Sequence, residues 1–102
     1  MPRGSSDGFE LRWSEEAVGA LRQIHRHIER DRPHTAARTV ESIVARMASL
    51  AASPHLGQRY PYADDPNLFQ LTYGHFRIAY RVDAPTVVVL AVFHGFIFLP
   101  QS

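Results

Sequence analysis

The sequence predicts a single α+β domain in which a two-helix hairpin packs on one face of a mainly antiparallel, twisted sheet. Its 102 residues suffice for one hydrophobic core but not for two domains. Apolar residues recur at the three-and-four spacing of helices in the first half of the chain and at alternate positions in the second half. The expected order of elements is βααβββ, in a domain spanning residues 9–99 between a flexible segment at 1–8 and a short end at 100–102.

The first strand is expected at Phe9 to Trp13, where apolar and charged side chains alternate. Ser14 follows as a helix N-cap, because its side-chain oxygen can accept a hydrogen bond from a free backbone N–H. The first helix should run to about Glu29. Its apolar stripe consists of Leu21, Ile24 and Ile28.

Pro33 is well placed at the first position of a second helix, where its missing N–H costs nothing. The apolar stripe of this helix is formed by Val40, Ile43, Met47 and Leu50. The helix should continue to about Ala52. Because only a short connection separates the two helices, they are expected to form a hairpin.

The stretch from Pro54 to Asn67 is rich in proline, glycine and aspartate, which indicates a loop. Its length makes it a candidate recognition loop. Beyond it the apolar pattern changes to strict alternation, and short connections favour an antiparallel meander of three strands. These strands are expected at Leu68 to Tyr73, His75 to Val82 and Thr86 to Phe93.

All eleven basic residues are arginines, and ten acidic residues leave a net charge of only +1. So small an excess does not indicate nucleic-acid binding, and the lack of lysine leaves every cationic role to arginine or histidine. The longest apolar runs are too short to cross a bilayer, and the polar first residues do not resemble a secretion signal. A cytoplasmic protein without a membrane association is therefore expected.

A cationic row is expected on the strand that begins at His75. By alternation His75, Arg77 and Arg81 lie opposite its apolar side chains, and Arg59 from the preceding loop could reach the same face. Such a row suits contact with phosphate or with an acidic partner surface. Alternatively it is a solvated face balanced by acidic residues, namely Asp64, Asp65 or Asp83.

His94 is the best candidate for acid–base chemistry, because imidazole titrates near neutrality. Alternatively, it caps the last strand by bonding a backbone group, and Tyr80 is expected in the core. No metal site is expected, because His25 and His27 are two residues apart on a helix and point in different directions, and cysteine is absent. No cofactor is expected, since the chain has no glycine-rich phosphate loop.

The last strand is apolar on both sides. By simple alternation one face carries Val87, Val89, Ala91 and Phe93, and the other carries Val88, Leu90 and Val92. One face can meet the helices, and the second, with the apolar tail Phe96 to Leu99, indicates an interface with a partner. The alternative is that the tail folds back over the sheet.

Four segments in this order resemble the RelE/ParE superfamily of small bacterial toxins, and more closely its ParE-like plasmid-stabilisation branch. They are residues 11–17, 49–57, 74–82 and 89–95. The resemblance implies a βααβββ toxin of a type II toxin–antitoxin pair, held silent by a cognate antitoxin in a hetero-oligomer. A helix or strand of that antitoxin would cover the apolar surface formed by Val88, Leu90, Val92, Phe96 and Phe98.

Two activities are known in the superfamily. ParE-like members poison DNA gyrase by binding it, and here the target contacts would be His75, Arg77, Arg81 and Arg59. RelE-like members cut ribosome-bound mRNA, and here the catalytic candidates would be Arg59, Arg77, Arg81 and His94. The absence of lysine, which several RelE-like nucleases use, favours gyrase binding. A third possibility is a weakened toxin that persists mainly as an antitoxin-binding protein, because Phe69 stands where many relatives have arginine.

Overall fold

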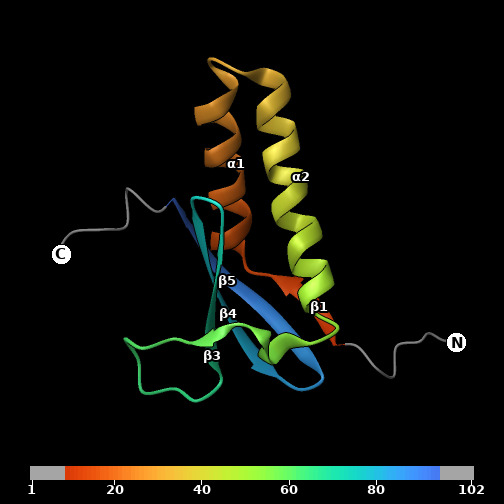
Figure 1. Ribbon diagram of the computed structural model, residues 1–102, viewed down its shortest axis with the longest axis vertical. Helices are drawn as coiled ribbons and strands as arrows, with labels where there is room; N and C mark the ends of the chain where they lie inside the picture. The colour runs from red at the N-terminus through yellow and green to blue at the C-terminus, as the bar shows by residue number, and fades with distance from the viewer. Residues whose placement is uncertain (1–8, 95–102) are drawn as a thin grey trace, which may run out of the picture.

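The computed structural model describes residues 9–94 and contains a helical hairpin on one side of a mixed sheet (Figure 1). The segment at 1–8 and the apolar tail with Phe96 and Phe98 lie outside the described residues. Between them the predicted order of strand, helix, helix and three strands is confirmed, with one short strand added.

Within residues 9–94 the sheet has five strands in the order β1-β5-β4-β3-β2. β1 (Glu10–Trp13) lies parallel to β5 (Thr86–His94), which pairs antiparallel with β4 (Phe76–Asp83). β3 (Leu68–Tyr73) and the edge strand β2 (Gln58–Arg59) continue the antiparallel pairing. The sequence did not predict β2, because a strand of two residues is too short to show an alternating pattern.

The hairpin consists of α1 (Glu15–Glu29) and α2 (Pro33–Leu50). Ser14 caps α1 as predicted, since its Oγ accepts a hydrogen bond from the N–H of Ala17 at 3.0 Å. α2 ends before the predicted Ala52, and the 3-10 helix η2 (Pro54–Leu56) follows. Pro54 disfavours helical backbone at Ser53, whose φ of −145° and ψ of 72° lie outside the helical region, so α2 cannot continue into η2.

The two faces of the sheet differ in what covers them. We term the face beneath the hairpin the helix face and the opposite one the open face (Figure 1). Burial alternates strictly along β4, as predicted: its helix-face side chains are buried, and Arg77, Ala79 and Arg81 on the open face are half-buried. The largest fully buried side chains include Tyr80, Ile43 and Met47, so the core lies between the sheet and the hairpin.

A β-bulge interrupts the alternation of β5. Ala79 pairs with Ala91 and Tyr80 pairs with Val89, which leaves Leu90 as an extra residue. The expectation that Val88, Leu90 and Val92 share one face is therefore wrong. Val92 is only 6% exposed and belongs to the core, on the same side as Val87 and Val89, whereas Val88 is half-buried on the open face.

The turn between β3 and β4 contains Gly74 and His75, because Tyr73 pairs directly with Phe76. Gly74 has a φ of 59°, in the left-handed region that glycine adopts without steric cost. His75 thus lies in the turn and not in the strand where alternation predicted it.

Candidate functional site

The open face carries two of the predicted arginines. Arg77 and Arg81 both project from β4 on this side, as the alternation predicted. Arg77 pairs across the sheet with Phe93 and Thr72, and Arg81 pairs with Val88 and Leu68. Their direct partners on the neighbouring strands are therefore apolar or neutral residues.

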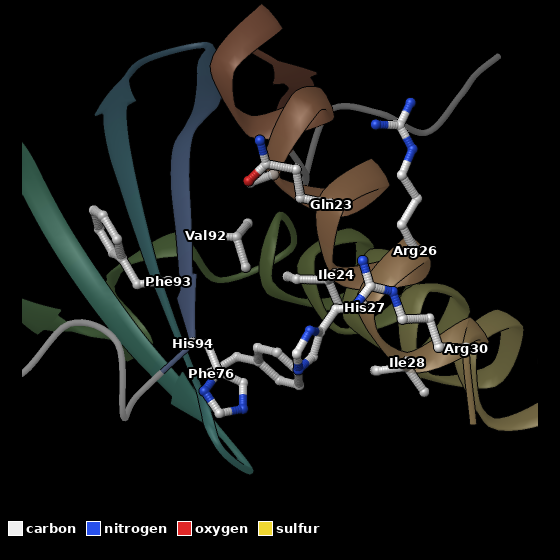
Figure 2. Close-up of a pocket in the computed structure, with 11 residues that line it drawn as sticks. Gln23, Ile24, Arg26, His27, Ile28, Arg30, Phe76, Val92, Phe93 and His94 are labelled. Carbon is white, nitrogen blue, oxygen red and sulfur yellow. The ribbon is translucent and has the colours of Figure 1, made fainter. Parts of the chain in front are cut away.

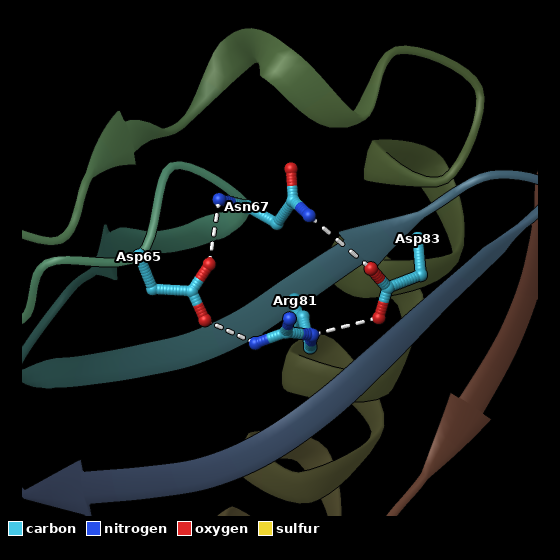
Figure 3. A network of polar contacts seen from close by, with 4 residues as sticks. All are labelled: Asp65, Asn67, Arg81 and Asp83. Carbon is cyan, nitrogen blue, oxygen red and sulfur yellow. Dashed lines mark hydrogen bonds and ion pairs between the residues drawn. The ribbon is translucent and has the colours of Figure 1, made fainter.

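Arg81 is held by two carboxylates (Figure 3). Its Nε donates to Asp83 at 2.7 Å, and its Nη1 donates to Asp65. The backbone N–H of Asn67 and the guanidinium of Arg81 hold the pKa of Asp65 below its ordinary value, and the two carboxylates raise the pKa of Arg81. This is the charge-balanced arrangement named above as the alternative to phosphate contact.

The network also fastens the chain that precedes β3. The backbone N–H of Asn67 donates to Asp65 at 2.9 Å, and the side-chain amide of Asn67 donates to Asp83 at 3.4 Å. The carbonyl of Asn67 accepts from the N–H of Val82 at 2.9 Å. Arg81 therefore ties a loop to the end of β4.

Arg59 does not reach the face of Arg77 and Arg81. In the ladder it pairs with Phe69, whose ring stacks on Tyr80 at 5.7 Å in the core. Because directly paired residues lie on the same side of a sheet, Arg59 belongs to the helix face, where it is exposed at the β2 edge. The expected cluster with Arg77 is therefore not formed.

His94 also belongs to the helix face. It pairs with Phe76, and the two rings meet edge to face at 5.4 Å. His75 reaches it from the turn, with ring centroids 6.3 Å apart. The structure thus brings His75 and His94 together but does not join them to Arg77 and Arg81. General acid–base cleavage of one phosphodiester needs its acid, base and cations around the same group of atoms.

A groove of about 680 Å³ opens beside His94, between α1 and the ends of β4 and β5 (Figure 2). Its apolar part is formed by Ile24, Ile28, Phe76 and Val92. Its polar part is cationic or neutral and includes Arg26, Arg30, His27 and His94. In Figure 2 the side chain of Phe93 points to the other side of the sheet, which agrees with its pairing with Arg77.

Sequence reasoning did not find this groove. The feature of the sequence that indicates the groove is the apolar stripe of α1, which includes Ile24 and Ile28. Ile24 packs against the core, yet both side chains remain only half-buried. A stripe longer than the sheet can cover leaves an apolar surface at its far end.

Tyr80 fastens the segment that leads into β2. It is fully buried, as predicted, and its hydroxyl donates to the carbonyl of Pro54 at 2.8 Å and accepts from the N–H of Gly57 at 3.1 Å. Burial raises the pKa of the Tyr80 phenol. The approach requires glycine, because a Cβ on Gly57 would lie 2.1 Å from the hydroxyl.

Within residues 9–94 no group of three or more His, Cys, Asp or Glu side chains could hold a metal ion. No helix there is long and apolar enough to cross a membrane.

Comparisons with known proteins place these features in a family. Residues 11–95 match the family model described as the ParE toxin of the type II toxin–antitoxin system parDE. No curated protein matches the sequence.

Solved structures share the fold at low sequence identity. The chromosomal ParDE toxin–antitoxin system of P. aeruginosa matches with a TM-score of 0.73 and 24% identity, covering 87% of this chain and 98% of that one. The toxin–antitoxin complex RelBE2 of Mycobacterium tuberculosis matches with a TM-score of 0.62 and 23% identity, covering 88% and 94%. A mutant of E. coli toxin RelE in the free state matches with a TM-score of 0.63 and 14% identity, covering 89% and 87%.

The family model spans both helices and all the strands of the sheet except the first residue of β1. The chain therefore belongs to the ParE toxin family of type II toxin–antitoxin systems, within the RelE/ParE superfamily.

Proposed function

We propose that this toxin inhibits growth by binding and poisoning DNA gyrase, and that a cognate antitoxin neutralises it. The observation that supports binding over RNA cleavage is the distribution of the candidate catalytic residues. Arg77 and Arg81 lie on the open face, whereas Arg59 and His94 lie on the helix face. Arg81 is moreover neutralised by Asp65 and Asp83, so it is poorly suited to hold a scissile phosphate.

The open face is the surface we assign to the target. It carries Arg77 beside Phe93, together with half-buried Val88 and Ala79, and no helix of the described chain covers it. A mixture of arginine and apolar side chains is typical of protein interfaces. Arg59 and His75 are exposed elsewhere and would take part only if the target extends beyond this face.

The groove beside α1 is the surface we assign to the antitoxin. The related structures include toxin–antitoxin systems and complexes, which supports a partner of this kind. An apolar floor with Arg26 and Arg30 at its polar side suits an amphipathic helix that carries carboxylates. Of the strand residues expected to bind the antitoxin, Val92 lines this groove, whereas Val88 lies on the opposite face.

The decisive experiment uses one preparation of purified toxin in two assays. DNA supercoiling by gyrase should be blocked, or cleaved DNA complexes should accumulate, and added antitoxin should restore supercoiling. Primer extension on mRNA in a translating extract should show no codon-positioned cuts. The control is Arg77→Ala, which should weaken the effect on gyrase.

The opposite pattern would reject the proposal. Cuts in mRNA that disappear in Arg81→Ala, with supercoiling unaffected, would identify a ribosome-dependent nuclease. A protein that inhibits neither supercoiling nor translation and does not slow growth would correspond to a weakened toxin that persists mainly as an antitoxin-binding protein.

A further inference from the structure

The loop between β2 and β3, residues 60–67, is fastened at both ends. At one end the N–H of Tyr60 donates to the carbonyl of Leu68 at 2.9 Å. At the other end Asp65 and Asn67 are held by Arg81 and Asp83 in the network of Figure 3. We term this segment the tyrosine loop. A loop held in this way has already lost much of the conformational freedom that binding would otherwise remove.

The fixed loop displays an aromatic side chain to solvent. Tyr62 is 69% exposed, and its ring contacts that of Tyr60 edge to face at 5.3 Å. Tyr60 in turn lies beside Arg77 and Phe93 of the open face. The tyrosine loop is therefore continuous with the face assigned to the target.

The chemistry of the loop indicates what it would bind. A tyrosine ring offers a large contact area at low cost in side-chain entropy and is enriched among the residues that dominate binding energy. Asp64, two residues further on, is exposed and makes no ion pair within residues 9–94. The matching partner surface has an apolar pocket for the ring and a basic group beside it for the carboxylate.

We propose that the tyrosine loop is the element with which the toxin grips its protein target, that Tyr62 is the anchor, and that Arg81 is the residue that positions it. The role of Arg81 is then indirect. It contacts neither the target nor a phosphate, but it holds Asp65 and so fixes the backbone that carries Tyr62. The inference rests on the proposed function only in requiring a protein target, and gyrase need not be that target.

The loop and the groove lie on different sides of the sheet. The loop joins β3 at Leu68, which pairs with Arg81, and its Tyr60 borders the open face, whereas the groove lies on the helix face and opens at Phe76, at the other end of β4. Phe93 is the one described residue that borders both Tyr60 and the groove. Target and antitoxin would thus use different surfaces, and a change in the loop should leave antitoxin binding intact.

The test compares Tyr62→Ala with the matched control Leu56→Ala. Leu56 is 72% exposed, which is close to the 69% of Tyr62, and it lies outside the loop, so its truncation also removes an exposed hydrophobic side chain. Three quantities are measured for each variant: growth inhibition on expression, affinity for purified gyrase, and affinity for the antitoxin. Tyr62→Ala should weaken growth inhibition and gyrase binding by about tenfold or more, with antitoxin affinity unchanged. Leu56→Ala should match the wild type in all three.

The positioning role of Arg81 is tested by a measurement that is specific to the loop and separate from the stability of the whole fold. Arg81→Gln should accelerate amide hydrogen exchange within residues 60–67 while the exchange of the core strands stays unchanged, and it should weaken target binding less than Tyr62→Ala does. Arg81→Lys, which keeps the charge, should restore part of the protection.

The outcomes separate this inference from the gyrase proposal. Tyr62→Ala that inhibits growth as strongly as the wild type, or Leu56→Ala that is equally impaired, overturns the role of the loop. Growth inhibition that depends on Tyr62 without any effect on gyrase supports the loop and rejects gyrase. A wild-type chain that never slows growth overturns both.

Discussion

Tyr80 and Gly57 show how one side chain can fix a segment more than twenty residues away. The hydroxyl of Tyr80 bonds Pro54 and Gly57, so the chain between η2 and β2 passes directly over the phenol. Alternation along β4 correctly predicted that Tyr80 points inward. It could not predict the partners of the hydroxyl, because Pro54 and Gly57 lie in a segment without periodicity.

Tyr80→Phe should destabilise the fold by about 1–3 kcal/mol, because two backbone groups lose their partner while the ring still fills the core. Gly57→Ala should cost more, since the added methyl group would meet the hydroxyl at 2.1 Å and the carbonyl of Gln70 at 2.7 Å. Urea unfolding measures both changes.

The double variant tests the contact itself. In the double variant the methyl group of Gly57→Ala no longer meets the Tyr80 hydroxyl, although it still meets the carbonyl of Gln70. The double variant should therefore lose less stability than the sum of the losses of the two single variants. Additive losses would show that the two residues act independently.

At the scale of elements, the helices and long strands could be predicted because their patterns extend over many residues. β2 could not, and neither could the bulge at Leu90, which leaves no mark in a run of apolar residues. The same two features explain why residues of the candidate site were assigned to the wrong face. The face of Arg59 depends on β2, and the face of Val92 depends on the bulge, so neither could be assigned by counting along the chain.

The tyrosine loop should respond to acid. The pKa of Asp65 is lower in the folded state than its ordinary value of 3.8, so the unfolded chain binds the proton more readily. The stabilisation by this carboxylate is therefore present above that ordinary value and is lost as the pH falls through the folded-state pKa. Asp65→Asn should remove this part of the acid dependence.

The measurement follows the backbone signals of residues 60–67 by NMR from about pH 6 to pH 2. The matched control is Asp64→Asn, because Asp64 has no ion pair within residues 9–94. If Asp64→Asn flattened the profile as much as Asp65→Asn, the ion pair with Arg81 would not be the cause.

At the scale of the whole molecule, the hairpin extends beyond the sheet (Figure 1). The groove lies where α1 meets the ends of β4 and β5 (Figure 2). An antitoxin segment with carboxylates would be attracted by Arg26, in the last turn of α1, and by Arg30, the residue that caps its C-terminal end. The charge reversal Arg26→Glu with Arg30→Glu should weaken antitoxin binding by about tenfold or more and make the remaining affinity less sensitive to salt.

Isothermal titration at two salt concentrations measures this effect. The control is Arg22→Glu with Arg38→Glu, which makes the same change in net charge at two exposed arginines outside the groove. Toxin carrying the double reversal should still inhibit growth and should escape neutralisation. Equal losses in the control would point to net charge and not to the groove.

The bulge makes β5 one residue longer than the stretch of β4 beside it, and this surplus connects the two layers of the domain. The carbonyl of Leu90 accepts a hydrogen bond from Ser14 Oγ at 3.0 Å, next to the carbonyl of Val89, which accepts from the N–H of Ser14 at 2.9 Å. Deleting Leu90 would leave every other β5 side chain on its present side of the sheet. Val89 and Ala91 would then be consecutive residues, and they already lie on opposite faces. We expect such a shortened chain to keep its sheet but to lose the hydrogen bond from Ser14 to Leu90, which helps to set the angle between the hairpin and the sheet.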